Sequence, residues 1–510
     1  MRNISGNKTL AKNTIYLSIR MLVVILINLY CSRVILKQLG FADYGVYNIV
    51  AGVVILISFL HNALSGASSR FIIYEIGKST DADINTVFNT TLYVHIAIVI
   101  FLVIVAIIFG SFFLEYYLNI PPARLDTAKN VFYFSVATAA INTLYIPFEA
   151  LLFAYEKFKI YAISSVGEAI GKLFAAVLII FSLFADKLLW YGILVFVAVL
   201  CTKVTVILYI RAKLATGIKI GSFVRKSSFQ PVITFFGWDI YGNFSLVLKD
   251  QGINILLNIF FGPLLNAANG IAQQVHVAVG TFSNSFLMAI KPQIIKNYAV
   301  NDLPEMIQLI YKSSKFSFFI LLFLSLPLFF EIEFILKLWL IQVPAFTAEF
   351  CQYIILINLI TGTMQSINYS IHATGKIKLL SFLSGTIFML IVPVVYLGFY
   401  FNMSAAFCYA VVLIFTLIAA FINIKILQKY ITRFSLRDFF SAVIIKCILV
   451  GGTSTISLAF LHYFIFADVT WLRLVQLLLI APCVIICSIY MLGLNRDERQ
   501  LVKSFVKKRL

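Results

Sequence analysis

Residues 89–113 read NTTLYVHIAIVIFLVIVAIIFGSFF. This stretch contains no Asp, Glu, Lys or Arg, and a helix of its length spans the roughly 30 Å of hydrocarbon in a bilayer, at about 1.5 Å per residue. The rest of the chain has the same character, because 61% of its 510 residues are hydrophobic and only 12% are charged. Such a chain has too little polar surface to cover a water-soluble globule, so we expect a membrane protein.

A scan for apolar runs of about 20 residues, working outward from this stretch, finds fourteen candidate membrane-spanning helices. They fall at 13–35, 44–66, 89–113, 127–151, 161–184, 188–210, 232–260, 267–290, 313–336, 349–372, 381–401, 406–427, 441–463 and 471–493. The sequence therefore predicts an all-α polytopic membrane protein with about 14 transmembrane helices.

The formal net charge of +19 is distributed unevenly between the two sides of the predicted membrane. The termini and even-numbered connections hold 28 of the 40 Lys and Arg residues, whereas the odd-numbered connections hold 7. An excess of basic residues on one side is typical of cytoplasmic loops, so both termini are predicted to be cytoplasmic. The charge is explained by topology, and we expect no nucleic-acid partner.

The connections carry no pattern typical of an enzyme. The chain has no glycine-rich phosphate loop and no Ser-His-Asp set, and its five histidines are scattered over five predicted helices. The seven cysteines show no metal-ligand spacing. We therefore expect neither catalysis, nor a metal, nor a cofactor.

Two internal matches indicate a duplication. Residues 38–65 align with a later stretch at a shift of 222, which places Gly40 on Gly262 and Asn62 on Asn284. The turn AYEKFK also matches ATGKIK at a shift of 219. Two matches with nearly equal offsets predict two pseudo-symmetric lobes of six helices each, followed by two additional helices. The predicted boundaries are 1–215, 216–430 and 431–510.

The predicted helix 232–260 carries charged residues in the stretch LKDQGIN at 248–254. A polar stripe follows its helical period, and it contains Asp239, Asn243, Asp250 and Asn254, with Lys249 beside it. Lys249 and Asp250 point about 100° apart on a helix and are predicted not to pair with each other. They either line a hydrated cavity or form buried pairs with neighbouring helices.

The predicted helix 13–35 occupies the same place in the first repeat. It carries Arg20 and Asn28, and the shift of 222 places Asn28 on Asp250. Because charges inside a span should face protein or water rather than lipid, the two polar helices predict a hydrated cleft between the lobes. Arg70 lies at the predicted cytoplasmic mouth.

The opening residues resemble a known family. Residues 12–52, KNTIYLSIRMLVVILINLYCSRVILKQLGFADYGVYNIVAG, and 65–78, SGASSRFIIYEIGK, are similar to the N-terminal lobe of bacterial polysaccharide transporters. These are flippases for lipid-linked oligosaccharide repeat units in the multidrug/oligosaccharidyl-lipid/polysaccharide (MOP) exporter superfamily, which also contains the MATE-like multidrug exporters. The most specific motif is LG-x-x-x-YG-x-Y at 39–47.

The resemblance implies a cargo and therefore roles for the polar residues. The cargo would be an undecaprenyl-pyrophosphate-linked oligosaccharide, moved to the outer leaflet by alternating access for O-antigen, capsule or another surface polymer. Arg20 is the first candidate for the pyrophosphate, because a guanidinium forms paired hydrogen bonds to phosphate, and Lys249 and Arg70 follow. Asn28, Asn243 and Asn254 would line the sugar cavity. Asp239 and Asp250 are candidates for ion coupling, or they hold the basic groups in place.

The same resemblance implies a location and partners. The protein would lie in the bacterial cytoplasmic membrane, in contact with its lipids and with polymerases and glycosyltransferases of the same pathway. Two alternatives remain. One is a cation-coupled multidrug exporter of the same superfamily, against which Arg20 and Lys249 argue. The other is a membrane glycosyltransferase or polymerase, against which the short outward loops argue.

Overall fold

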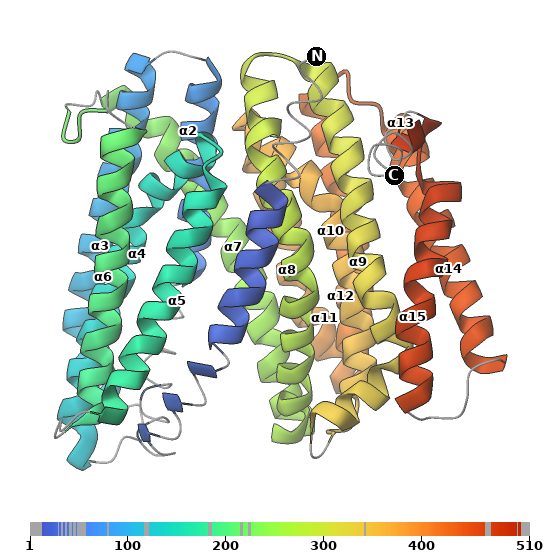
Figure 1. The fold of residues 1–510 in the computed structure, drawn as a ribbon, viewed down its shortest axis with the longest axis horizontal. Coiled ribbons are helices and arrows are strands. Elements are labelled where there is room, and N and C mark those ends of the chain that lie inside the picture. The colour runs from blue at the N-terminus through green and yellow to red at the C-terminus, as the bar shows by residue number, and fades with distance from the viewer. Residues whose placement is uncertain are drawn as a thin grey trace. The chain divides into compact units, whose positions relative to one another are not determined.

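A computed structural model gives the fold. It describes residues 13–500 except for most of 29–57, the short stretches 79–80, 117–121, 182–185, 215–217, 223–225, 341–342 and 465–470, and residue 497. The first described helix is Asn13–Asn28. The long helices that follow are α2 (Ser58–Lys78), α3 (Asp81–Tyr116), α4 (Leu125–Ala154), α5 (Phe158–Phe181), α6 (Lys187–Lys213), α7 (Lys226–Phe261), α8 (Pro263–Ala299), α9 (Leu303–Trp339), α10 (Thr347–Thr374), α11 (Lys378–Tyr400), α12 (Phe407–Tyr430), α14 (Ile445–Phe464) and α15 (Trp471–Ser488) (Figure 1). The short α13 (Leu436–Phe439) and the π-helical turns Phe440–Ile444 and Ile489–Gly493 flank the last pair.

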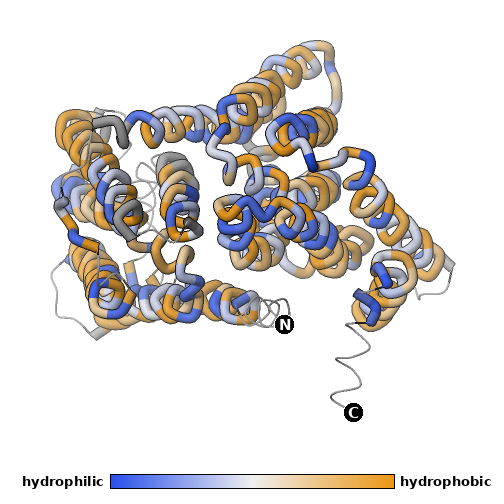
Figure 2. The backbone as a smooth tube through the Cα atoms, turned by 90° about the horizontal axis from the view of Figure 1, so that it is seen from above, coloured by the Kyte–Doolittle hydropathy of each residue, from blue (hydrophilic) through white to orange (hydrophobic). Residues whose placement is uncertain are grey.

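The predicted fold class is confirmed. Among the described residues, eleven helices are long and apolar enough to cross a membrane, and Asn13–Asn28 is a shorter apolar helix. Hydrophobic residues occur along all of the long helices (Figure 2), and many large hydrophobic side chains are exposed, for example Ile108 on α3 and Ile259 on α7. This exposure is expected in a bilayer, where a helix satisfies its backbone hydrogen bonds internally and presents apolar side chains to lipid. Most of the predicted span 44–66 lies outside the described residues.

The chain divides into two compact units. Unit 1 contains residues 1–244, 295–301 and 375–378, and unit 2 contains 245–294, 302–374 and 379–510. One division between the units falls inside α7, between Phe244 and Ser245. The lobe boundary at 215/216 stays a prediction. The two additional helices belong to unit 2.

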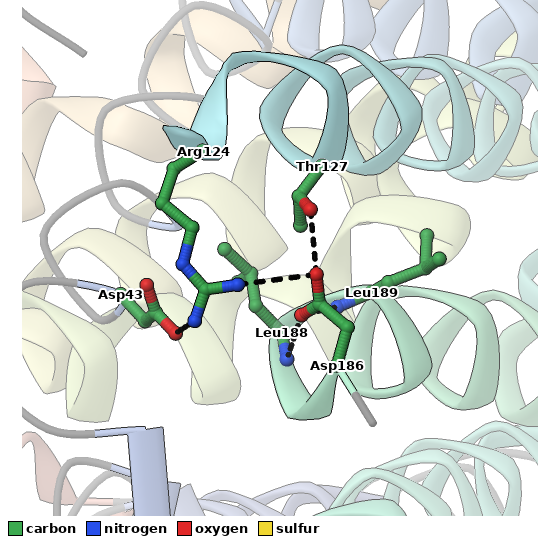
Figure 3. Close-up of polar contacts among 6 residues, drawn as sticks. All are labelled: Asp43, Arg124, Thr127, Asp186, Leu188 and Leu189. Atoms are coloured by element: carbon green, nitrogen blue, oxygen red, sulfur yellow. Dashed lines mark hydrogen bonds and ion pairs between the residues drawn. The ribbon is translucent and has the colours of Figure 1, made fainter. Parts of the chain in front are cut away.

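Unit 1 is organised around α4, which packs against α2, α3 and α6. Arg124, just before α4, joins three segments that are distant in sequence (Figure 3). Its guanidinium donates to Asp43 at 2.5 Å and to Asp186 at 3.2 Å. Asp43 lies within the LG-x-x-x-YG-x-Y stretch that carries the family resemblance.

Asp186 has a second role, as the N-cap of α6. Its Oδ1 accepts hydrogen bonds from the backbone amides of Leu188, at 3.1 Å, and Leu189, at 3.3 Å, while its Oδ2 accepts from Thr127 Oγ1 at 2.5 Å (Figure 3). The cap satisfies amide groups that have no partner in the first helical turn.

Two substitutions of Asp186 distinguish what its helix cap contributes to stability from what its ion pair with Arg124 contributes. Asp186→Ala removes both and is expected to lower the free energy of unfolding by about 1–2 kcal/mol. Asp186→Asn keeps a capping oxygen and should lose less than about 1 kcal/mol, because Arg124 is more than one-third exposed. Unfolding titrations in mixed detergent micelles measure both, and equal losses would contradict a separate capping contribution.

Unit 2 has an apolar core built from α7 to α12, with Leu257, Cys351, Ile391 and Val395 fully buried. Within this unit α10 packs against both α9 and α12. The position of α10 brings its polar residues close to those of α8, α11 and α12.

The two additional helices are attached to α9 by buried ion pairs. Glu331 of α9, 2% exposed at a kink with φ −106° and ψ 20°, accepts hydrogen bonds from His462 of α14 and Arg473 of α15. Near the other end of α9, Lys315 pairs with Glu498 at 2.6 Å. The pairs therefore hold the end of α14, the beginning of α15 and the segment after α15 against α9.

Candidate functional site

Arg20 lies in the middle of the helix Asn13–Asn28 and is half-buried. Its Nη1 donates to Tyr161 Oη at 2.9 Å and contacts Ser165 Oγ at 3.5 Å, both on α5. The guanidinium also lies over the Tyr161 ring, 5.0 Å from its centroid. Its Nε is buried without a hydrogen-bond partner among the described residues. Arg20 is therefore held by neutral groups alone in this part of the chain.

Several other cations inside predicted spans have carboxylate partners, whereas Lys425 lies over the Phe421 ring and Lys446 donates to the Asn495 amide oxygen. In unit 1, Lys172 and Lys203 lie 2.7 and 2.8 Å from the two oxygens of Glu168. In unit 2, Lys315 and Arg473 have the partners described above. Neutralisation by a nearby carboxylate compensates for moving a charge out of water. Among the described residues Arg20 has no carboxylate within ion-pair distance, and Glu149 is the acidic residue that acts electrostatically on the Tyr161 hydroxyl to which Arg20 donates.

Arg70 of α2 is 9% exposed and lies among aromatic rings. Its guanidinium carbon is 4.6 Å from the centroid of Phe71 and 4.7 Å from that of Tyr74. It also lies against Gly375, whose φ of +74° is a backbone conformation that glycine adopts without strain. A Cβ at Gly375 would be 2.5 Å from Arg70 Nη2, so the arginine is packed tightly within unit 1.

Asp239 and Asn243 also belong to unit 1. Asp239 is 6% exposed and lies against α2, since a Cβ at Gly66 would be only 2.9 Å from its Oδ2. Asn243 donates to the Asp239 backbone carbonyl at 2.8 Å. Asn28 is exposed at the end of its helix. The structure brings Asp239 and Asn243 together but shows no contact between them and Arg20 or Asn28 among the described residues.

Lys249 and Asp250 form an ion pair with each other, 2.9 Å from Nζ to Oδ1, so the prediction that they would not pair is wrong. The lysine side chain is long enough to bridge the angle between neighbouring positions on the helix. Lys249 Nζ also lies 5.8 Å from the centre of the Phe388 ring. The lysine side chain is 15% exposed and the aspartate side chain 45% exposed.

The pair lines a small cavity within unit 2. The volume is about 30 Å³, enough for one or two water molecules and too small for a sugar ring. The polar lining comes from Lys249, Asp250, Gln273, His276 and Tyr409. The cavity that Lys249 and Asp250 line in this conformation is therefore large enough for a water molecule or a small ion.

Asn254 belongs to a hydrogen-bond chain beside this cavity. Asn269 of α8 donates to Asn254 Oδ1 at 3.1 Å and accepts from Tyr409 of α12 at 2.7 Å, and Gln273 contacts Tyr409 Oη at 3.4 Å. Asn269, Gln273 and His276 are not among the residues predicted from the sequence. Their spacing of 4 and 3 residues places them on one helical face and could have identified them.

Comparisons with known proteins agree with this fold. No protein-family model matches the chain, and no curated protein does. Among solved structures, an outward-facing multidrug resistance MATE family transporter of the MOP superfamily matches with a TM-score of 0.71 and 13% identity, covering 84% of this chain and 96% of that one. A MOP superfamily transporter from Pyrococcus furiosus matches with 0.69 and 12%, at the same coverage. A mutant of a Vibrio cholerae MATE transporter matches with 0.68 and 15%, covering 86% and 99%.

The chain therefore has the fold of MATE transporters of the MOP superfamily and is a multi-pass membrane protein. These structural neighbours are transporters rather than enzymes. The Pyrococcus furiosus transporter has a binding pocket of reversed polarity, which suggests a different function for that protein.

Proposed function

We propose that this protein is a flippase that moves an undecaprenyl-pyrophosphate-linked oligosaccharide from the inner to the outer leaflet. The proposal combines a transporter fold with basic side chains inside the membrane spans and with the resemblance of residues 8–80 to polysaccharide transporters. The mechanism would be alternating access of two lobes. Location in the bacterial cytoplasmic membrane with both termini cytoplasmic, and cooperation with polymerases and glycosyltransferases, are parts of this proposal.

The observation that carries the proposal is the environment of Arg20. A charged side chain at the centre of a spanning helix costs about 2.5–3.5 kcal/mol on insertion scales. Arg20 meets that cost with a tyrosine and a serine and has no carboxylate within ion-pair distance among the described residues. A pyrophosphate would supply the missing negative charge through paired, charge-assisted hydrogen bonds.

A second observation favours cargo with a lipid tail. A cavity of about 340 Å³ lies within unit 2 between α8, α9 and α15, the last of which is one of the two additional helices. Its lining is almost entirely apolar and includes Phe282, Phe323 and Leu478. An isoprenoid segment fits such a lining chemically, whereas a hydrated drug cation would gain no polar contact there.

The membrane potential would favour the proposed direction of movement. When the membrane potential is 100 mV and negative inside, moving one negative charge outward releases about 2.3 kcal/mol. A pyrophosphate carries at least two such charges, so the potential could assist transport without a coupled ion. Coupling through Asp239 or Asp250 remains part of the proposal as a second energy source, although Asp250 already has Lys249 as its counter-ion.

The competing function is cation-coupled export of drugs, the activity that the name of the first structural neighbour gives for that protein. The observation that favours it is the buried carboxylate of Asp239. Arg20 would repel an organic cation, whereas Lys249 is neutralised by Asp250, so our choice of the flippase depends on Arg20.

One experiment separates the two functions. Liposomes containing the purified full chain would carry a fluorescent lipid-linked oligosaccharide in one assay and ethidium in a parallel assay. We expect accelerated movement of the lipid-linked oligosaccharide between leaflets, stimulated by an imposed potential, and no ethidium transport above protein-free liposomes. Ethidium transport without oligosaccharide movement would replace the flippase with the drug exporter.

A further inference from the structure

A row of polar side chains runs along one face of α10, although α10 is itself apolar enough to span a membrane. The row follows helical spacing and consists of Asn358, Thr361, Gln365, Asn368, Tyr369 and His372. Gln365, Asn368 and Tyr369 are half-buried, and the Gln365 and Tyr369 side chains hydrogen-bond to each other. Neither the ion pairs nor the small cavity described above uses these three residues.

Two buried residues from other helices support the amide of Asn368. Ser384 of α11 donates to Asn423 Oδ1 at 2.6 Å, and Asn423 of α12 donates to Asn368 Oδ1 at 3.1 Å. The Asn368 amide nitrogen then contacts Gln365 Oε1 at 3.5 Å. Ser384 and Asn423 are 7% and 6% exposed. Because each bond uses a donor on one residue and an acceptor on the next, the chain fixes which way the Asn368 amide points.

This support is costly for the protein. Each polar group buried inside the membrane needs a hydrogen-bond partner, whereas two apolar residues at the positions of Ser384 and Asn423 would need none. A function for the oriented amide explains the arrangement, since binding sites hold their contact groups in place with supporting hydrogen bonds.

A basic group lies beside the row. Lys291 Nζ of α8 is 5.4 Å from the centroid of the Tyr369 ring. The row therefore combines oriented amides, an aromatic ring and an ammonium group in one unit. An amide presents a donor and an acceptor together, so it can hydrogen-bond to two neighbouring sugar hydroxyls. An aromatic ring can pack against the C–H face of a sugar ring. An ammonium group can bind a phosphate.

We propose that Gln365, Asn368 and Tyr369, with Lys291 beside them, bind the sugar attached to the phosphate of the cargo, and that Asn423 is a positioning residue for Asn368. This inference rests on the proposed function and assigns the sugar-recognising residues, none of which belongs to the residues predicted from the sequence. All of these residues belong to unit 2.

The test measures binding of defined probes to the purified full chain in lipid nanodiscs. The probes are farnesyl diphosphate and its derivatives carrying a single N-acetylglucosamine, glucose or galactose. Wild-type protein should bind at least one sugar-bearing probe about tenfold more tightly than farnesyl diphosphate, the gain that one to two net hydrogen bonds provide. Asn368→Leu, Gln365→Leu and Asn423→Leu should each reduce that gain to about twofold or less, while affinity for farnesyl diphosphate stays unchanged.

The matched control is Gln352→Leu. Gln352 is an amide on the same helix that donates to the Phe329 carbonyl at 3.3 Å, and it lies about 220° around the helix from Gln365. This variant should keep the full sugar gain. The inference is overturned if wild type shows no sugar gain, or if the three row variants keep it even where their melting temperatures fall.

Arg20→Gln distinguishes this inference from the proposed function. Loss of affinity for every probe, farnesyl diphosphate included, supports the anion role of Arg20. If Arg20→Gln changes nothing while the row variants still remove the sugar gain, the anion contact fails and the sugar site stands.

Discussion

Replacing Arg20 with glutamine is expected to reduce flipping of a lipid-linked oligosaccharide by about 100-fold or more while the protein stays folded. Hydrogen bonds to charged groups contribute about 1.5–3 kcal/mol each, and a guanidinium can form two to one pyrophosphate. Loss of both corresponds to at least two factors of ten. Glutamine keeps a donor for Tyr161 Oη, so the contact between the first helix and α5 is retained in part.

Two further substitutions define what Arg20 contributes. Arg20→Lys keeps the charge but loses the planar pair of donors, so we expect transport between those of wild type and Arg20→Gln. Tyr161→Phe removes the hydrogen bond that holds the guanidinium at 2.9 Å and keeps the ring, so a decrease of less than about tenfold is expected. Transport by all three variants is measured in liposomes, as the initial rate at which the fluorescent cargo becomes protected from external dithionite. Wild-type rates for Arg20→Gln would exclude an anion role for this residue.

Replacing Glu498 with alanine is expected to give the largest loss of stability. Lys315 is 2% exposed, and its ammonium lies 2.6 Å from Glu498 Oε2. Removing one partner of a buried ion pair leaves the other charge buried alone and costs about 3–5 kcal/mol. The segment after α15 should lose its attachment to α9 as a consequence, because the pair with Lys315 connects the two. Its local fold should also loosen, since Glu498 accepts from the Asn495 backbone amide at 2.8 Å.

A double variant tests this explanation. Lys315→Met combined with Glu498→Leu removes both charges and should recover most of the stability lost in Glu498→Ala, since apolar replacements of buried ion pairs are often neutral or stabilising. Unfolding in mixed micelles, followed by circular dichroism, gives the free energies for a double-mutant cycle. Equal destabilisation of the single and double variants would show that contacts other than the ion pair hold this segment.

The ion pairs of Lys249, Glu331 and Lys315 are contacts that could not be predicted from the sequence. The pairing of Lys249 with Asp250 was missed because helical spacing describes where Cβ atoms point, whereas a lysine reaches beyond its own direction. The partners of Glu331 are 131 and 142 residues away, and the partner of Lys315 is 183 residues away. Polar residues in membrane helices find partners on whichever helix packs beside them, and hydrophobic spacing does not specify that neighbour.

The amide row of α10 illustrates a different limit. Its spacing was visible in the sequence, but the supporting Ser384 and Asn423 lie on two other helices and only the fold brings them to Asn368. Arg20 was identified from the sequence because an arginine inside an apolar span is exceptional, whereas the neutral character of its partners was known only from the structure.

The sequence by itself determined that this protein spans the membrane many times and roughly where most of the described helices lie. The physical reason is that a bilayer of fixed thickness without hydrogen-bonding solvent demands long apolar helices, and that demand acts on each segment separately. Tertiary structure decided which charges are neutralised, where the division inside α7 falls and which amides are oriented. Those properties depend on side chains from different helices meeting in space, which is a consequence of packing that no single segment encodes.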